Sequence, residues 1–545
     1  MRPKLLFACL LTAGVVACAP APPDLPAEGA SWWAHVQFLA DDSLEGRNTG
    51  TEGYDKAADY VESQFEALGL TPAGTTGYRQ PVPLESRQLV ADQSRLALVR
   101  DGRETPLIIG EDATLSARSE LDGSTEVPMV FVGYGLSIPE AGWNDLEGMD
   151  LEGKVAVYVN AFPPVTVSGS VRSHVNNANE RWLALKSAGA IGVATMSVPR
   201  PPAADSAAAG RGRGGRGGGG GRRTPAPIIS LSDPDVNASA GQLVSIRLTQ
   251  GGAAKVLAGS GHSLDELGRL LADEQPLPRF ALPGMLRAQA ALEREPIASA
   301  NVAGMFEGSD PALRSEYVIM TAHLDHVGIG REVDGDDIYN GAMDNASGVA
   351  SMIEIARLLK ASGVETKRSV LFVAVTAEEK GLLGSRYFAG HPTVPSEQVV
   401  ADINLDMFLP LYPLTVIEVF GLEESSLGES VRAAAETLGI DVQTDREPEQ
   451  NRFIRSDQYS FIRSGVPALA FKFGYEFGSP EETIRLDFVS DVYHRPSDDA
   501  NQEVNLEAAA TFNRVIMTLL QSVANDDARP TWNEDSFFRR FATSR

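Results

Sequence analysis

The sequence predicts an α/β protein in which a mostly parallel, mixed sheet is flanked by helices and interrupted by a β-rich insertion. From Ala298 onward, apolar runs of strand length alternate with stretches of helical spacing, which is the pattern of a parallel sheet covered on both faces. Between about Arg87 and Pro283, short β-type runs are separated by glycine and turn residues. The chain has 545 residues, 43% of them hydrophobic, which is enough for two or three domains.

The chain begins with a targeting segment, residues 1–17. Two basic residues precede an apolar run, residues 5–16, that is too short to span a bilayer, and small residues precede Cys18. These features resemble a bacterial lipoprotein signal, cleaved before Cys18 and followed by lipidation of its thiol; an ordinary secretory signal is the alternative. We expect an exported protein that reaches a membrane only through this lipid anchor. Ala19 favours the outer membrane of the cell envelope, facing the periplasm or the exterior.

A proline-rich tether, residues 18–30, is expected next, because proline cannot continue a helix or a central strand. Residues 55–68 carry apolar side chains at helical spacing and end at Gly69, which predicts an amphipathic helix. We assign residues 31–90 to the first segment of the main domain. The only other cysteine, Cys9, lies in the removed signal, so the mature protein is expected to have no internal disulfide.

Residues 91–285 are predicted to form the inserted β-rich domain. Residues 128–132 and 154–159 have the composition of strands, and residues 181–190 have the spacing of a helix. Residues 203–225 look like the Arg-Gly-Gly segments of RNA-binding proteins, but glycine this dense cannot offset its ordering entropy, which predicts a disordered surface loop. The formal net charge of −26 repels nucleic acid, so we expect no nucleic-acid partner.

Residues 286–525 form the second segment of the main domain and carry its alternating elements. An apolar stripe from Val349 to Leu359 predicts one helix, and residues 506–520 predict a terminal helix that Asn505 caps. Residues 526–545 are assigned to a C-terminal tail. The strands are expected at residues 317–322, 369–376, 399–405 and 467–473.

Acidic and histidine residues follow these strands at the points where each strand ends. Because ligands bind beyond the carboxyl ends of strands in open α/β sheets, we expect these side chains to converge. Each alone has an ordinary explanation as a turn, a helix cap or a solvated helix start, but chance does not explain why all of them fall at strand ends. The set is His323, Asp325, Asp344, Glu378, Glu379, Asp406 and His494.

Two imidazoles with several carboxylates and no thiolate suit a metal of the zinc type, and the ligands suffice for two ions. If Asp344 bridges the ions, His323 and Asp406 would complete one site while Glu379 and His494 complete the other.

The remaining polar residues have other expected roles. Glu378 would be left beside the site without a metal, where a general base is needed. Asp325 is a natural acceptor for the ring N–H of His323 and would fix its tautomer. His326 is not expected to be a ligand.

The strand-end residues lie in five motifs, TAHLDHVG, NGAMDNASGVA, TAEEKGLLGS, NLDM and YHRPSDD. In order and rough spacing these motifs resemble the co-catalytic zinc aminopeptidases, whose clan also contains the glutamate carboxypeptidases and the non-catalytic transferrin receptor. The resemblance covers about residues 31–90 and 290–525. It implies the zinc exopeptidase fold, the same five ligands, Glu378 as base and Asp498 as a support for the last histidine. Tyr493, beside that histidine, is expected either to hold the oxyanion or to pack.

The insertion resembles a known module as well. VFVGYG at residues 130–135, the strand entry at residues 151–155 and residues 186–192 are similar to a protease-associated domain, which peptidases of this clan carry near the mouth of the site. An unrelated β insertion is the alternative. Two positions depart from the family pattern, Gln458 where histidine is common and Arg495 where threonine is common. Neither is an expected ligand, so they bear on substrate preference more than on activity.

We therefore expect a metal-dependent exopeptidase, specifically an aminopeptidase that removes N-terminal residues from peptides by attack of a water bridging two zinc ions. Other divalent metals are alternatives. In a carboxypeptidase of the same clan, Arg452, Arg455 or Arg463 would have to receive the terminal carboxylate. A non-catalytic receptor on this fold would have lost ligands, and a glutaminyl cyclase works with one zinc, whereas both ligand sets are complete here. The expected partner is a peptide substrate, and the sequence makes no prediction of oligomeric state.

Overall fold

The computed structural model describes residues 23–121, 123–199 and 227–544. The predicted signal segment, the lipidation site Cys18 and the glycine-arginine segment 203–225 lie outside the described residues. Within them, no helix is both long enough and apolar enough to cross a bilayer.

The centre of the main sheet consists of parallel strands that the apolar runs predict. They are β18 (Ser369–Val375), β15 (Tyr317–His323), β19 (Val399–Asn404) and β22 (Ala468–Phe473), in this spatial order. Because all of them run in the same direction, their carboxyl ends meet at one edge of the sheet.

Antiparallel strands extend this centre on both sides. β14 pairs with β18 and β2, and β20 pairs with β22. The described residues place ten strands in this sheet, including a short strand β1 on β14. The outer strands are β11 (Ile228–Leu231), β2 (Arg79–Leu89), β1 (Thr71–Pro72), β14 (Leu292–Phe306), β20 (Val416–Phe420) and β21 (Asp441–Thr444).

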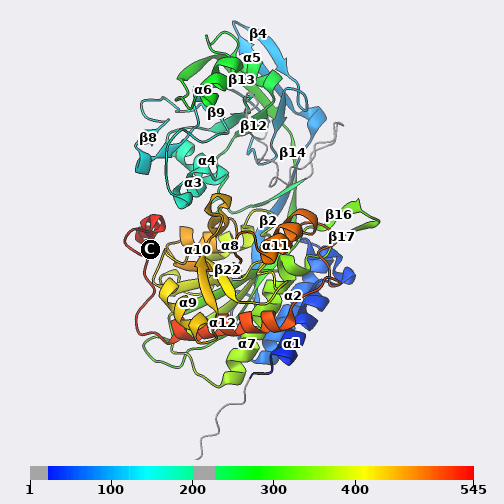
Figure 1. Cartoon of the computed structure of the whole chain (residues 1–545). Coiled ribbons are helices and arrows are strands. Elements are labelled where there is room, and N and C mark those ends of the chain that lie inside the picture. Colours follow the sequence, from blue (N-terminus) through cyan, green and yellow to red (C-terminus); the bar gives the residue numbers. More distant parts are fainter. Residues whose placement is uncertain (1–22, 122, 200–226, 545) are drawn as a thin grey trace, which may run out of the picture.

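Helices cover both faces of the main sheet, as the alternating pattern predicts. One layer packs on a core that includes Trp32, Phe408 and Phe512, and it lies below the sheet in Figure 1. The opposite face carries two shorter helices, which meet through Phe388 and Phe461. The first layer consists of α1 (Leu25–Leu39), α2 (Glu52–Leu68), α7 (Ser347–Ser362), α9 (Leu427–Glu436) and α12 (Leu506–Asn525), and the second of α8 (Leu383–Gly390) and α10 (Gln458–Arg463).

The N-terminal tether is shorter than predicted. Helix α1 begins at Leu25, inside the expected tether 18–30. The Asp24 side chain accepts a hydrogen bond from the backbone N–H of Ala27 at 3.2 Å, and Pro26 stands in the first turn, where a missing N–H costs nothing. The Asp24 cap therefore allows a helix to begin where the prolines had predicted an extended segment.

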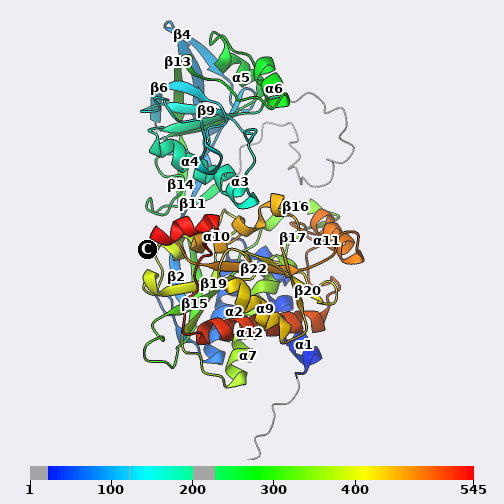
Figure 2. The same cartoon turned by 60° about the vertical axis from the view of Figure 1, so that its left-hand side comes forward.

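A second sheet lies apart from the main one, at the top of both views (Figures 1 and 2). In the described residues eight strands form it, in the order β4-β3-β13-β6-β9-β10-β12-β5. Helices α5 (Gln250–Leu257) and α6 (Leu264–Ala272) accompany it. The strands are β3 (Arg95–Arg100), β4 (Arg103–Leu107), β5 (Ala113–Leu115), β6 (Gly123–Val132), β9 (Val155–Val159), β10 (Gly192–Met196), β12 (Val244–Leu248) and β13 (Arg279–Ala290).

Two details differ from the segment boundaries expected for the insertion. The boundary after residue 285 falls inside β13, which continues to Ala290. Strand β11, inside the expected insertion, pairs with β2 and extends the main sheet, with Ile228 opposite Arg87. The insertion therefore contributes to both sheets.

Helices α3 (Gly169–Asn176) and α4 (Ala178–Ser187) join the second sheet to the main domain. His174 Nδ1 lies 2.7 Å from the hydroxyl of Tyr459, and Arg463 Nε lies 3.0 Å from Glu180 Oε1. Both views show α3 directly above α10 (Figures 1 and 2).

The expected C-terminal tail is part of the fold. Trp532 is buried and donates its indole N–H to the carbonyl of Gly465 at 3.0 Å. The 3-10 helix η8 (Phe537–Ser544) then places the ring of Phe541 5.5 Å from that of His174, between centroids. Aromatic burial, which the sequence analysis did not weigh for this segment, fixes it at the junction of the two domains.

We expect Phe512→Ala to destabilise the main domain by about 3–5 kcal/mol, the usual cost of removing a buried aromatic ring. Phe512 is fully buried and stacks on Phe408 with ring centroids 4.2 Å apart. Urea unfolding followed by circular dichroism measures the change. Phe477→Ala, at a side chain that is 61% exposed, is the matched control and should change stability by less than about 0.5 kcal/mol. Equal losses in both variants would contradict this account of the core.

Candidate metal centre

The structure brings the predicted ligands together at the carboxyl edge of the parallel strands. Strand β15 ends at His323, and a short π-helical turn, η4 (Ala342–Ala346), carries Asp344 to the start of α7. Asp406 follows β19, and His494 follows helix α11 (Pro480–Asp491). The donor atoms form two groups that share Asp344, one of His323, Asp344 and Asp406, the other of His326, Asp344, Glu379 and His494.

The two oxygens of Asp344 face different groups. Its Oδ1 lies 3.2 Å from His323 Nε2, which is also 3.8 Å from Asp406 Oδ1. Its Oδ2 lies 3.0 Å from His494 Nε2, which is 3.1 Å from Glu379 Oε1. This is the arrangement expected of a carboxylate that bridges two ions.

The residues fit metal ions of the zinc type. Ligand atoms bound at about 2.0–2.2 Å around one tetrahedral ion are separated by roughly 3–4 Å, which is the spacing in both groups. Glu379 Oε1, His494 Nε2 and both ring nitrogens of His326 are buried without a well-aligned hydrogen-bond partner among the described residues. Buried polar atoms normally have a hydrogen-bond partner, so these unpartnered nitrogen and oxygen atoms indicate that a cation binds between them.

The placement of His326 differs from expectation. Its Nδ1 lies 2.9 Å from Glu379 Oε1 and 3.9 Å from Asp344 Oδ2, so it belongs to the second donor group. Its ring also meets that of His494, with centroids 5.4 Å apart. The expected ligand sets did not include His326, but the chain turns back after the strand and returns the ring to the site.

The role expected for the Asp325 side chain was wrong. His323 Nδ1 lies 3.0 Å from the backbone carbonyl oxygen of Asp325, which orients the ring, whereas the carboxylate points elsewhere. The carboxylate accepts hydrogen bonds from the backbone N–H groups of Glu378 at 3.0 Å and Glu379 at 3.4 Å, and from the Thr49 hydroxyl at 3.1 Å. Asp325 therefore fixes the chain that carries the expected base and a ligand.

Asp498 also supports a different neighbour. It was expected to hold His494, but its carboxylate accepts from the backbone N–H groups of Met343 at 2.8 Å and Asp344 at 3.0 Å. It thus fixes the backbone of Asp344, the residue that the two donor groups share. Tyr493 stacks on His494 with ring centroids 4.0 Å apart, which is the packing role, while the oxyanion role stays a prediction.

Arg47, which the sequence analysis missed, clamps two of the ligand loops. The side chain is almost completely buried and donates to the carbonyls of Leu324 at 3.0 Å, Asn340 at 2.5 Å and Gly341 at 3.0 Å, as well as to Leu39. Residue 324 follows His323, and residues 340–341 precede Asp344. Nothing in the local sequence signals contacts so distant along the chain.

Two further charged residues border the site. Lys472 Nζ donates to the backbone carbonyl of Asp406 at 2.6 Å. A lysine inside an otherwise apolar strand was a usable signal that the sequence analysis passed over. Asp457 is fully buried just before α10, and burial raises its pKa to about 7.

Burial and charge pairing set the protonation states of the metal-free site. Burial opposes protonation of His494, but its contacts with Asp344 and Glu379 outweigh this and raise its pKa to about 10. The pKa of His323 is likewise raised well above its usual value, against burial, by Glu378, Asp344 and Asp406.

The pKa values of the adjacent glutamates shift in opposite directions. Burial and the charge of Asp344 act to raise the pKa of Glu379, but contacts with His326 and His494 lower it to about 2. Burial raises the pKa of Glu378 well above its usual value, and neighbouring carboxylates add to the shift against the attraction of His323. The Glu379 side chain is thus anionic, as a metal ligand would have to be, and Glu378 is a carboxylate with increased proton affinity.

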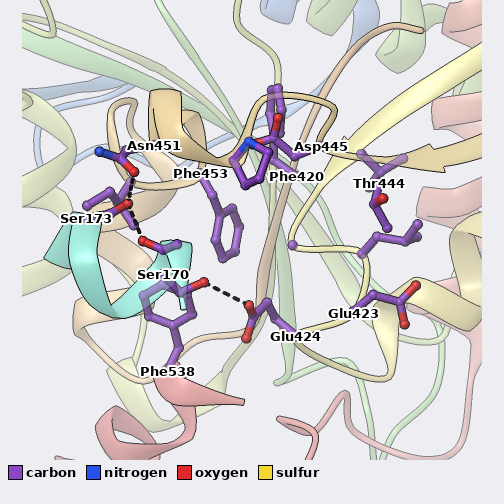
Figure 3. Close-up of a pocket in the computed structure, with 16 residues that line it drawn as sticks. Ser170, Ser173, Phe420, Glu423, Glu424, Thr444, Asp445, Asn451, Phe453 and Phe538 are labelled. Atoms are coloured by element: carbon purple, nitrogen blue, oxygen red, sulfur yellow. Dashed lines mark hydrogen bonds between the residues drawn. The ribbon is translucent and has the colours of Figure 1, made fainter. Parts of the chain in front are cut away.

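A separate hollow lies at the junction of the two domains (Figure 3), with an empty volume of ≈ 660 Å³ that is partly open to solvent. None of the donor residues lines it. Two hydroxyl groups that line it, both on α3, already have hydrogen-bond partners. Ser170 donates to Glu424 at 3.2 Å, and Ser173 donates to Asn451. Phe453 lies near the middle of the drawn residues, and Phe538 lines the hollow below Ser170 (Figure 3).

Comparison with known proteins also points to a metal-dependent peptidase. Residues 301–520 match Peptidase family M28. "Probable leucine aminopeptidase 2" of Aspergillus fumigatus is 29% identical over 307 residues, 54% of this chain and 58% of that protein. "Aminopeptidase YwaD" of Bacillus subtilis is 29% identical over 219 residues, 39% of this chain and 43% of that protein. "Probable zinc metalloprotease" of Pyrenophora tritici-repentis is 28% identical over 262 residues, 43% of this chain and 59% of that protein. The chain spans about half the length of the curated relatives it matches.

Two solved structures are similar over most of the chain. "Aminopeptidase from Aneurinibacillus sp. strain AM-1" has 18% sequence identity and a TM-score of 0.49, covering 93% of this chain and 96% of that one. "BSAP, a zinc aminopeptidase from Bacillus subtilis" has 19% identity and a TM-score of 0.44, covering 93% and 98%.

We expect metal binding to release protons at neutral pH. His494, with a pKa of about 10, is protonated at pH 7 in the metal-free protein and must lose its proton to become a ligand. Zinc titration by calorimetry in buffers of different ionisation enthalpy should show release of at least about one proton, and affinity should rise with pH. His494→Gln should remove about one proton from the count, and His391→Gln, at an exposed histidine, should not. Unchanged release in His494→Gln would contradict the assignment.

Proposed function

We propose that this chain, whose residues 301–520 match peptidase family M28, is an aminopeptidase that removes N-terminal residues from peptides with the help of two zinc ions. The observation that carries the proposal is the position of Asp344, whose two oxygens serve two complete donor groups, with Glu378 directly beside them. The printed names of the relatives, leucine aminopeptidase, aminopeptidase and zinc metalloprotease, support it.

Two zinc ions, when bound, would supply Lewis acidity that polarises the scissile carbonyl and makes water easier to deprotonate. The chain's own residues complete the chemistry. Glu378 takes the proton of the attacking water and delivers it to the leaving amine, a task suited to a carboxylate whose pKa burial raises. Asp325 holds Glu378 in place through its backbone N–H. Tyr493, whose pKa burial raises, stays protonated and is proposed to donate to the oxyanion.

The excess of carboxylates around the site favours a substrate with a free α-ammonium group. Of the three arginines considered for a carboxypeptidase, two are engaged in ion pairs. Arg452 pairs with Glu447, Arg463 pairs with Glu180, and Arg455 donates to a backbone carbonyl. The charges around the site therefore favour an aminopeptidase over a carboxypeptidase.

Two further parts of the proposal concern the rest of the chain. The protein is exported and held in a bacterial cell envelope through lipidation of Cys18. The second sheet with its helices, including the parallel strands β9, β10 and β12, is a domain of the protease-associated type. The motif VFVGYG, which ends β6, supports the second assignment.

We expect Glu378→Gln to keep its zinc and to lose activity on leucine p-nitroanilide by about 10²–10⁴-fold, the usual contribution of a general base. The amide preserves the shape of the side chain but cannot accept the proton. Metal content by elemental analysis and kcat/KM are measured on the same samples. Glu397→Gln, at an exposed glutamate, is the control and should match the parent. Zinc loss in Glu378→Gln would make Glu378 a ligand instead of the base.

Blocking the substrate amine should abolish hydrolysis. If carboxylates receive the α-ammonium group, the zinc-loaded protein cleaves Leu-Gly and leaves N-acetyl-Leu-Gly intact, because acetylation removes the charge. Release of free amino acids is followed by chromatography. Cleavage of the acetylated peptide alone would replace the aminopeptidase by a carboxypeptidase, and cleavage of neither, with zinc bound, would favour a non-catalytic protein.

A further inference from the structure

Helices α8 and α10 lie side by side on the face of the main domain that points toward the second sheet (Figure 1). Ser385 and Ser460 place their hydroxyls 3.0 Å apart at the contact. Each helix carries an arginine close to this point, Arg386 directly after Ser385 and Arg463 at the end of α10. The pairing of the two helices therefore brings two guanidinium groups to the same surface.

Few carboxylates lie close to these arginines. Glu180 of α4 lies 3.0 Å from Arg463 and accepts from the hydroxyl of Tyr459 at 3.3 Å. Arg118, an exposed residue on the turn after β5, belongs to the second domain and is close enough for its charge to act on Arg386. Among the described residues, no carboxylate lies within ion-pair distance of Arg386 or Arg118.

The lowered pKa of Arg386 is consistent with this excess of positive charge. Burial lowers the pKa of Arg386, and the positive charges of Arg118 and Arg463 lower it further, against the attraction of Glu180. A positive cluster this incompletely balanced is unusual in a chain whose formal net charge is −26.

The cluster borders the metal centre. Arg386 Nη2 donates to the carbonyl of Gly381 at 3.3 Å, and the N–H of Gly381 donates to the carbonyl of Glu378 at 2.8 Å. Arg386 is thus one hydrogen-bonded turn away from the expected base. A peptide held at the metal centre would pass this point within a few residues, since an extended chain advances about 3.3 Å per residue.

We infer that Arg386 and Arg118, backed by Arg463, form a subsite that binds a carboxylate of the peptide substrate. This inference rests on the proposed function and adds a preference to it. A guanidinium group matches a carboxylate with two parallel hydrogen bonds, and the two domains supply one arginine each. The carboxylate is either the C-terminus of a short peptide or an acidic side chain, and the two sources differ in which substrate the subsite selects.

The test compares kcat/KM for leucine release from matched peptides by the zinc-loaded full chain. Leu-Gly-Gly is paired with its C-terminal amide, and Leu-Gly-Glu-amide is paired with Leu-Gly-Gln-amide. In the parent we expect the acid of at least one pair to be preferred by about tenfold, the effect of one charge-assisted hydrogen bond. Preference in the first pair identifies the C-terminus, and preference in the second identifies the side chain.

Variants then assign the preference to the cluster. Arg386→Gln should reduce the ratio within the selected pair to about one, and Arg118→Gln, at an exposed side chain whose replacement hardly affects folding, should reduce it in part. Arg432→Gln removes an equal charge from α9, where the side chain pairs with Glu423, and should keep the parental ratio. The preference should also weaken as salt is added.

Each outcome decides between the subsite and the proposed function. Equal rates within both pairs, or the same ratio in Arg386→Gln and Arg432→Gln, would overturn the subsite while leaving the aminopeptidase intact. If no peptide is cleaved, the proposed function fails, and calorimetric binding of the same pairs to zinc-loaded Glu378→Gln still tests the subsite. Equal affinities there would overturn it as well.

Discussion

The constraint on which the rest of the structure depends is the concentration of carboxylates at the carboxyl edge of the parallel strands. Asp344, Glu379, Asp406 and Glu378 lie close enough to shift one another's pKa values. Like charges in a site with little water repel strongly, so the fold must provide cations there. In the metal-free protein, protonated histidines such as His323 supply that charge. Divalent ions would replace those protons, which couples metal affinity to pH and to the stability of the site.

The loops that carry these ligands have little regular structure, and hydrogen bonds from charged side chains to their backbones define them instead. Ala377, Met407 and His494 have positive φ angles although none is glycine, and each stands at or beside a residue of the site. Conformations of this kind cost about 1–3 kcal/mol each and persist only where the surroundings over-determine them. Asp325 accepts from the two backbone N–H groups that follow Ala377, and Asn345 Oδ1 accepts from the N–H of Met407 at 3.3 Å. Arg47 binds the backbone after His323 and before Asp344. A segment almost 300 residues upstream of the ligands is therefore as necessary to the site as the strands.

The sequence predicted the edge at which the site forms but not how its parts are held. Alternation of apolar runs reveals the strands, and the rule that ligands gather at strand ends then selects residues such as His323 and Asp406. The same rule is silent on which atom of a side chain faces which partner, so Asp325 and Asp498 were assigned to the wrong neighbours. His326 was left out of the expected ligand sets, and its distance in sequence from the strand end gives no sign that a turn returns it to the site. Arg47 left no signal at all, because contacts between a side chain and distant backbone carbonyls have no periodicity.

One short helix, α10, has contacts with both the insertion and the metal centre. At one end of α10, Arg463 pairs with Glu180 of the second domain, and one residue before the other end Asp457 lies buried among the carboxylates of the site. A displacement of α4 relative to the main sheet would break the ion pair between Glu180 and Arg463 at one end of this six-residue helix. The same displacement would separate Arg118 from Arg386, because they stand on different domains. The proposed arginine cluster and the Arg463–Glu180 ion pair therefore depend on the same interface, which makes the second domain part of the proposed substrate site.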